Sequence, residues 1–233
     1  MEPYQSAVRS MESSHRSTLM LRCKVVVVGD ATVGKSALIS MFHSGGSSFP
    51  KQYLMTAWVD FRVKVVPIAG TTTAVELYLF DCGGQSIFNQ IEANNVQYEN
   101  ASFLVLVYDV TNQASFESCG KWLQMVTKGR SSAMPGVLVA NKIDLESVDR
   151  RVVSQRTGES FAEANGLQYF ETSALEADYM EPFTYVAETF AQKYEDHLHD
   201  AEGGGNKKLM DSTSLLSANG FGSSGSSFGI IQT

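Results

Sequence analysis

Short apolar runs alternate with helical patterns along the middle of the chain. The first run, 22–28, ends in four consecutive valines, and such a continuous β-branched stretch is typical of a buried strand. Further runs of strand length lie at 61–68, 74–80, 103–107, 137–140 and 168–171. Small and hydroxyl residues join the first two of these further runs, which predicts an antiparallel hairpin.

Helices are predicted between and after these strands. The first runs from Lys35 to about Phe42, and the second runs from about Phe116 to Lys128 with apolar residues three or four positions apart. The last helix carries one apolar stripe, which we interpret as core packing rather than a cofactor site. The stripe consists of Phe183, Val186, Ala187, Phe190, Ala191, Tyr194 and Leu198. Strands alternating with helices predict an α/β fold, with a mostly parallel sheet and helices on both faces.

The two ends of the chain differ in composition from its middle. Residues 1–20 are polar and mixed in charge, and 203–233 contain seven glycines and seven serines. A composition rich in glycine and serine is typical of flexible segments. We therefore expect a flexible arm at 1–20, one folded domain at 21–201 and a flexible tail at 202–233.

A phosphate-binding motif, G-x-x-x-x-G-K-S/T, directly follows the first strand, from Gly29 to Ser36. Its glycines let successive backbone N–H groups face phosphate oxygens, and the following helix adds its positive dipole end. Lys35 is expected to reach the β- and γ-phosphates, and the hydroxyl of Ser36 to ligate Mg²⁺. Further nucleotide contacts are expected from Ala31, Thr32, Val33, Gly34 and Ala37. The motif alone does not distinguish GTP from ATP.

A base-recognition motif, N-K-x-D, follows the strand at 137–140. The carboxylate of Asp144 can accept hydrogen bonds from N1–H and the N2 amine of guanine, two donors that adenine does not offer. Asn141 is expected to tie this loop to the phosphate loop, and the stem of Lys142 to cover the ring or the ribose. These residues argue against the alternative of an ATP-dependent enzyme such as a nucleoside kinase.

Ser173 and Ala174, which follow the strand at 168–171, complete the expected base site. The backbone N–H of Ala174 is placed to donate to the guanine O6, and Ser173 to brace Asp144. The tetrapeptide that contains them supports a base site only because it follows the base-recognition motif in the chain.

Two further segments are predicted to sense the γ-phosphate. The motif D-x-x-G-Q follows the strand at 74–80: Asp81 is placed to reach Mg²⁺ through a water, the N–H of Gly84 to bond the γ-phosphate, and Gln85 to orient the attacking water. Thr56 is the only threonine between residues 36 and 71, so we expect it to be the second magnesium ligand. Phe49 has two open interpretations, stacking edge-on against guanine or packing into the core.

Composition excludes several classes of partner. The net charge of −7 argues against a basic surface for nucleic acid or for acidic lipids. Three cysteines, an odd number without metal-ligand spacing, predict reduced thiols in the cytosol. No apolar run approaches the about 20 residues that span a bilayer. Glu2 and the absence of a cysteine near the C-terminus lead us to expect no direct lipid anchor.

Taken in order, the five motifs resemble those of the Ras superfamily, and within it the Rab branch, over roughly residues 21–195. The stretches 21–24, 36–42, 63–67 and 136–142 are similar to the Rab-like GTPases of the intraflagellar transport B complex. This resemblance implies a three-layer P-loop small GTPase fold with a six-stranded sheet, and slow hydrolysis of bound GTP to GDP with Mg²⁺. It also implies partners in that complex, a small β-sandwich subunit and coiled-coil subunits, and a location in the cytoplasm and the cilium or flagellum.

Three departures from the Ras pattern leave two hypotheses open. Ala31 stands where the Ras branch has glycine, Cys82-Gly83 replaces Thr-Ala, and Ala57-Trp58 replaces Ile-Gly, which does not favour standard Rab effector recognition. The first hypothesis is a switch that cycles between GTP and GDP. The second is a structural subunit that holds nucleotide for stability.

Overall fold

The computed structural model describes residues 19–50, 52, 54–56, 58–84, 98–148, 150–176 and 178–203. Its centre is a six-stranded sheet in the order β2-β3-β1-β4-β5-β6. The strands are β1 Leu19–Val28, β2 Val59–Pro67, β3 Thr73–Cys82, β4 Phe103–Asp109, β5 Gly136–Asn141 and β6 Gln168–Thr172. Only β2 and β3 pair antiparallel, and the other neighbours are parallel. The predicted α/β fold with its hairpin is confirmed.

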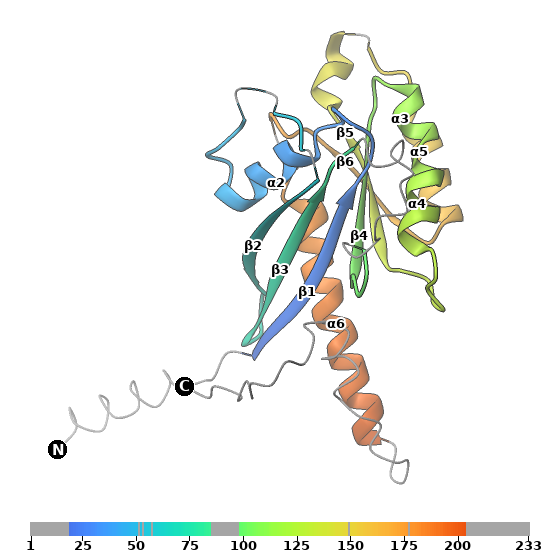
Figure 1. Cartoon of the computed structure of the whole chain (residues 1–233). Coiled ribbons are helices and arrows are strands. Elements are labelled where there is room, and N and C mark those ends of the chain that lie inside the picture. The colour runs from blue at the N-terminus through green and yellow to red at the C-terminus, as the bar shows by residue number, and fades with distance from the viewer. Residues whose placement is uncertain are drawn as a thin grey trace, which may run out of the picture.

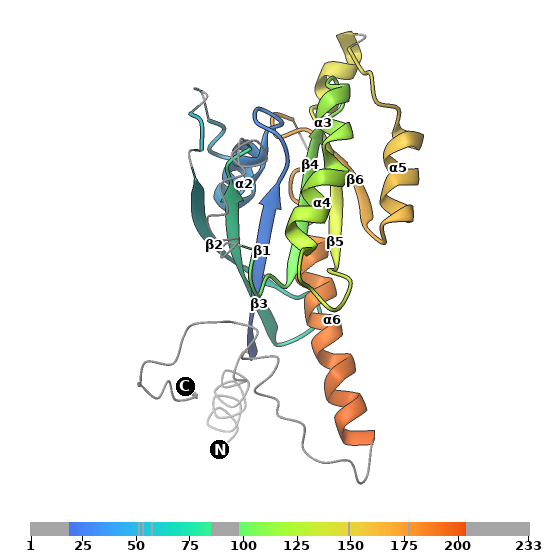
Figure 2. The same cartoon turned by 45° about the vertical axis from the view of Figure 1, so that its right-hand side comes forward.

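Helices cover both faces of the sheet (Figures 1 and 2). On one face, α2 Lys35–Ser44 and α6 Glu181–Gly203 enclose a core in which the rings of Phe42 and Phe183 stack at 4.5 Å. On the other face lie α3 Gln113–Glu117, α4 Cys119–Thr127 and α5 Gln155–Ala164, with Tyr108 and Trp122 fully buried. The central strands β4 and β5 are buried at every position because they are covered from both sides.

Several predicted element bounds were wrong. The expected helix from Phe116 to Lys128 is two helices separated at Ser118, and the first begins earlier because the side chain of Asn112 caps it by accepting from the N–H of Ser115 at 3.2 Å. Helix α5 and the 3₁₀ helix η2 Ile143–Val148 were not predicted. Leu198 is 45% exposed, because α6 continues beyond the ends of the strands (Figure 1), so this residue does not belong to the core stripe.

The expected arm and tail fall largely outside the described residues. Leu19 and Met20 belong to β1, where they pair with Thr73 and Ala74, so the first strand begins inside the segment assigned to the arm. Helix α6 likewise extends to Gly203, past the expected boundary at 201. No helix within the described ranges is long and apolar enough to cross a membrane.

Buried thiols predict a loss of stability at alkaline pH. Cys23, Cys82 and Cys119 are buried and unpaired, and burial raises the pKa of Cys82 and of Cys119 to about 12. An unfolded thiol ionises near about pH 8.5, so the folded state holds these protons more tightly and the free energy of unfolding falls as the pH rises from there toward the folded pKa. Urea unfolding at about pH 7 and about pH 10.5 should show this decrease. The Cys119→Ala variant should lose less stability over this range, and an equal loss would contradict the prediction.

Candidate nucleotide site

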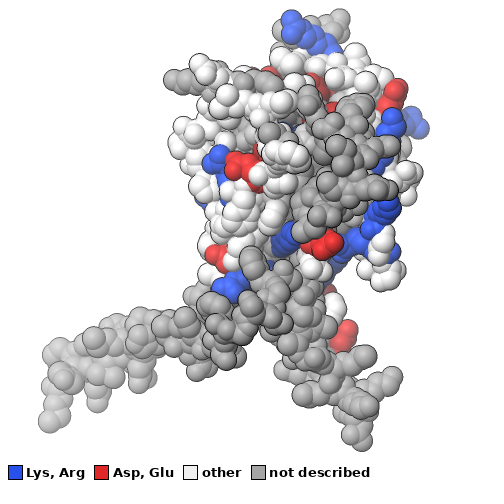
Figure 3. Space-filling model, viewed as in Figure 1, with Lys and Arg blue, Asp and Glu red and all other residues white. Residues whose placement is uncertain are grey.

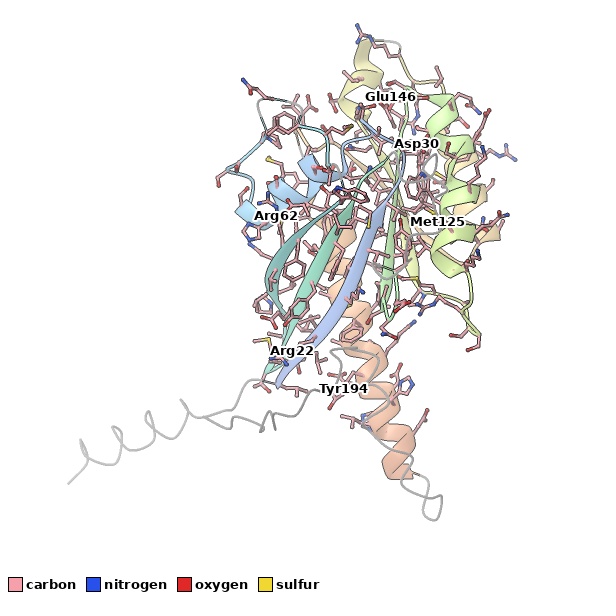
Figure 4. The ribbon with its side chains drawn as sticks, viewed as in Figure 1. Arg22, Asp30, Arg62, Met125, Glu146 and Tyr194 are labelled. Atoms are coloured by element: carbon pink, nitrogen blue, oxygen red, sulfur yellow. The ribbon has the colours of Figure 1, made fainter. Side chains whose placement is uncertain are left out.

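The predicted site residues lie at one end of the sheet. The loops that follow β1, β3, β5 and β6 meet at the carboxyl ends of these strands, which is where ligands of open α/β sheets bind. Figure 4 shows Asp30, from the loop after β1, and Glu146, from η2 after β5, at this end of the molecule. Loops far apart in the chain therefore contribute to one surface.

The phosphate loop requires its glycines for steric reasons. Gly29 and Gly34 have φ angles of +142° and +101°, which L side chains rarely adopt. A Cβ at Gly29 would lie 2.1 Å from the carbonyl oxygen of Val107, and one at Gly34 would lie 2.2 Å from the amide nitrogen of Asn141. The loop can pack against β4 and β5 only without these side chains.

Lys35 is buried at the first position of α2, with 6% of its surface exposed. Its Nζ donates to the carbonyl oxygens of Gly29 at 2.8 Å and Asp30 at 2.9 Å, so the loop curls around the ammonium group. Burial lowers the pKa of Lys35 below its usual value, and the nearby carboxylate of Asp81 opposes this shift. A ligand with several negative charges would favour the charged form of this lysine.

The three residues predicted to hold magnesium lie together. Ser36 Oγ donates to Asp81 Oδ2 at 2.5 Å, and Thr56 Oγ1 lies 3.2 Å from Ser36 Oγ and 3.5 Å from Asp81 Oδ2. Asp81 Oδ1 is buried and has no hydrogen-bond partner among the described residues, and burial raises the pKa of this carboxyl. Two hydroxyls beside a buried carboxylate, one oxygen of which has no partner among the described residues, fit a hard divalent cation such as Mg²⁺.

The base-recognition loop is joined to the loop after β6. Ser173 Oγ donates to Asp144 Oδ1 at 2.7 Å, as expected of a brace, and accepts at 3.2 Å from the backbone N–H groups of Leu175 and Glu176. The N–H of Ala174, predicted to face guanine O6, contacts Asn141 Oδ1 at 3.4 Å. Asp144 therefore has a fixed orientation, which recognition of a flat base requires.

Asn141 connects three loops through one buried amide. Its Nδ2 donates to the carbonyl oxygen of Val33 in the phosphate loop at 2.8 Å, which agrees with the tie that the sequence predicts. Its Oδ1 accepts from Thr172 Oγ1 at 3.2 Å. The next residue, Lys142, has a φ of +68°, and its Nζ forms an ion pair of 2.6 Å with Asp109 Oδ2 at the end of β4. This ion pair anchors the Lys142 side chain at the site.

The remaining predicted residues have mixed outcomes. Gly84 lies directly against the phosphate loop, because a Cβ there would come within 2.2 Å of the backbone nitrogen of Ala31. Phe49 is 41% exposed, which does not support packing into the core, and its stacking on guanine stays a prediction. Thr32 has a φ of +66°, a strained loop position. Gln85, the predicted catalytic residue, lies outside the described residues.

Sequence reasoning missed three side chains that support the site: Asp109, Arg151 and Trp122. Asp109 stands at the carboxyl end of β4, a position that could have suggested its role. Arg151 and Trp122 lie in segments without a motif, so no sequence signal indicated them.

Arg151 links the base-recognition loop to β6. We therefore expect it to slow the release of a bound guanine nucleotide, relative to a variant without this link. Its guanidinium contacts Glu146 Oε2 at 2.8 Å, the carbonyl oxygen of Val153 at 2.8 Å, and the carboxylate of Glu171. The Arg151→Met variant removes the one group that bonds all three acceptors, and we expect GDP to dissociate roughly 5- to 10-fold faster.

Release of a fluorescent GDP analogue measures this effect. The control is Arg62→Met, because Arg62 pairs with Asp60 on the exposed edge strand β2. Equal release rates in the two variants would show that Arg151 does not brace the base site.

The fold and the converging loops place this protein in the class of P-loop proteins that bind nucleotides. Residues 24–193 match the Ras family, and the chain therefore belongs to this family of small GTPases.

Two kinds of relative are similar to the chain. Intraflagellar transport protein 27 homolog of Mus musculus is 43% identical over 76% of this chain and 95% of the mouse protein. Intraflagellar transport protein 27 of Chlamydomonas reinhardtii is 42% identical over 78% of this chain and 90% of its own length. Ras-related protein Rab-30 of Homo sapiens is 40% identical over 68% of this chain and 74% of its own length. The predicted resemblance to Rab-like GTPases is confirmed.

Proposed function

We propose that this chain binds GTP and GDP with Mg²⁺ and acts as a slow-hydrolysing switch in an intraflagellar transport complex. One observation carries the nucleotide part: the bracing of Asp144 by Ser173 and the cluster of Ser36, Thr56 and Asp81 lie at the same end of the sheet. A purine-recognition site and a cation site at the same end of the sheet fit a guanine nucleotide with its metal. The transport part rests on the names of the relatives with 42–43% identity.

Each part of the site has a separate role in this proposal. Lys35 and the loop N–H groups bind the phosphates, and Ser36, Thr56 and Asp81 hold Mg²⁺, which neutralises charge on the β- and γ-phosphates when it is bound. Thr56 and Gly84 approach the phosphate loop from two different segments, so a γ-phosphate can order both at once. Loss of that phosphate removes the shared contact, and the two segments are released.

Nucleotide specificity tests the proposal directly. Protein stripped of nucleotide is titrated calorimetrically with GDP, a non-hydrolysable GTP analogue and ADP, each with Mg²⁺ and with EDTA. We expect binding of both guanine nucleotides, stronger with Mg²⁺, and weak binding of ADP. Tighter binding of ADP than of GDP, or no binding of either guanine nucleotide, would contradict the proposal.

Intrinsic hydrolysis is expected to be slow. Ras-type sites without an arginine supplied by a partner turn over on the order of 10⁻⁴ s⁻¹. The backbone of Ala31 lies against Gly84, and its methyl group adds bulk to this loop that the glycine of the Ras branch lacks. Single-turnover assays with GTP should therefore give a rate of this order. A partner-free rate at or above about 1 s⁻¹ would contradict this expectation.

A nucleotide-stabilised structural subunit is the second candidate function. It is favoured by Ala31, which stands where the Ras branch has glycine and whose backbone lies against Gly84 in the phosphate loop region where the γ-phosphate is expected. The partners proposed by resemblance are a small β-sandwich subunit and coiled-coil subunits, in the cytoplasm and in the cilium or flagellum. Pull-downs from flagellated cells with the GDP and GTP-analogue forms distinguish the two functions, because equal recovery means no switch.

A further inference from the structure

The phosphate loop carries a carboxylate of its own, on Asp30. This residue lies between Gly29 and Ala31, and its backbone carbonyl accepts a hydrogen bond from the buried ammonium of Lys35 at 2.9 Å. A negative side chain at this position repels the phosphates that the loop is proposed to bind. The fold must therefore direct this carboxylate elsewhere.

A buried tryptophan on a helix far along the chain supplies the contact. The indole Nε1–H of Trp122 donates to Asp30 Oδ1 at 2.8 Å. Trp122 is fully buried in α4, within the core on the face of the sheet opposite α2. The hydrogen bond joins a carboxylate to an indole N–H that is buried in the core, and charge-assisted bonds of this kind are strong.

A neighbouring residue of α4, Cys119, also senses the charge of Asp30. Burial raises the pKa of the Cys119 thiol to about 12, and the negative charge of Asp30 contributes to this shift. The direct contact with α4 is the hydrogen bond from Trp122, and the effect on Cys119 agrees with a carboxylate on this side of the loop. Figure 4 shows Asp30 on the side of the sheet where α3 and α4 pack.

The position of Gly84 indicates that the γ-phosphate is the phosphate most sensitive to Asp30. A Cβ at Gly84 would lie 2.4 Å from the carbonyl carbon of Asp30 and 2.2 Å from the nitrogen of Ala31. The peptide that follows Asp30 is therefore the surface on which the predicted γ-phosphate sensor rests. A carboxylate released at this point opposes a triphosphate more than a diphosphate, because the triphosphate carries the additional charge nearby.

We propose that Trp122 is a positioning residue that holds the carboxylate of Asp30 against α4 and so maintains affinity for GTP relative to GDP. The inference rests on the proposed nucleotide binding, whose γ-phosphate end it refines. Trp122 would thus support the phosphate loop from α4, a helix that contains no nucleotide-binding motif.

The Trp122→Phe variant tests this role through the ratio of GTP-analogue to GDP affinity. We expect this ratio to fall about tenfold, equivalent to about 1.4 kcal/mol. The second substitution Asp30→Asn, made in the Trp122→Phe background, removes the released charge and should restore the ratio to within about threefold of the wild type. Loss of core packing alone would lower both affinities and would not be rescued by Asp30→Asn.

The chain offers a matched control, because its second tryptophan, Trp58, is 84% exposed. Trp58→Phe should leave the affinity ratio within about twofold of the wild type. The same variant also assigns the NMR signals of the two indole N–H groups, because the signal that remains belongs to Trp122. The Trp122 resonance should shift when Asp30→Ala removes its acceptor. If this resonance does not move, or if Trp122→Phe leaves the ratio unchanged, the inference is wrong.

Two further results keep the test decisive. If Trp122→Phe does not fold, the Asp30→Asn variant alone decides: a ratio raised by about tenfold or more would show that the carboxylate already opposes the triphosphate in the wild type, which overturns the inference. A change below about threefold, together with the resonance shift, supports it. Wild-type protein that binds neither guanine nucleotide would overturn the proposed function itself, which is a distinguishable failure.

Discussion

Replacing Asp144 by asparagine should weaken binding of GDP and GTP on the order of 10³-fold, because a site built for paired hydrogen bonds rejects a mismatched partner. Asparagine retains one acceptor but turns an N–H donor toward a donor of guanine. The brace from Ser173, at 2.7 Å from Asp144 Oδ1, holds the mismatched group in place. Competition against a fluorescent GDP analogue measures the loss.

Xanthine nucleotides provide the control for this substitution. Xanthine has a carbonyl where guanine has the N2 amine, so the asparagine N–H at position 144 finds an acceptor. The Asp144→Asn variant should therefore bind xanthosine diphosphate more tightly than GDP, whereas the wild type prefers GDP. Unchanged GDP affinity in the variant would remove Asp144 from the base site.

Replacing Ser36 by alanine should abolish most of the effect of Mg²⁺ on nucleotide binding. The variant lacks the hydroxyl that lies 2.5 Å from Asp81 Oδ2 and 3.2 Å from Thr56 Oγ1, so one of three clustered oxygen ligands is lost. We expect GDP affinity in Mg²⁺ to fall about 10- to 100-fold. In EDTA, where no metal contributes, wild type and variant should bind GDP similarly.

Ser40 supplies the matched control for this experiment. It lies one turn further along the same helix, α2, and is half-buried like Ser36. Ser40→Ala should retain the full dependence on Mg²⁺. An equal loss of GDP affinity in EDTA and in Mg²⁺ for Ser36→Ala would indicate damage to the phosphate loop rather than loss of a metal ligand.

The central strands could be predicted from the sequence because burial on both faces leaves a continuous apolar run. The runs at 103–107 and 137–140 lie within β4 and β5, which are buried throughout. Helix α5 was missed because it is short and mostly polar: only Gly158 and Ala162 of its residues are buried, and Phe161 is its one large apolar residue. The early start of α3 depends on a local cap at Asn112, and the break falls at Ser118 rather than at a Gly or Pro, so periodicity reveals neither.

The loop motifs could be predicted for a different reason: phosphate and base chemistry demand particular residues at a fixed spacing. The residues that support these loops follow no such spacing. Trp122 reaches Asp30 across 92 positions of the chain, and Arg151 joins η2 to β6. Both contacts depend on which helix packs on which face, so a local pattern cannot indicate them.

The sequence by itself determined the order of the strands, the phosphate loop and the residues proposed to recognise guanine, because these follow from local apolar runs and from the chemistry of the ligand. The tertiary structure alone decided that Ser36, Thr56 and Asp81 share hydrogen bonds, and that the carboxylate of Asp30 is held by α4. Contacts of this kind arise only when the sheet order brings distant segments to one end of the sheet, where buried polar groups must find partners in one another.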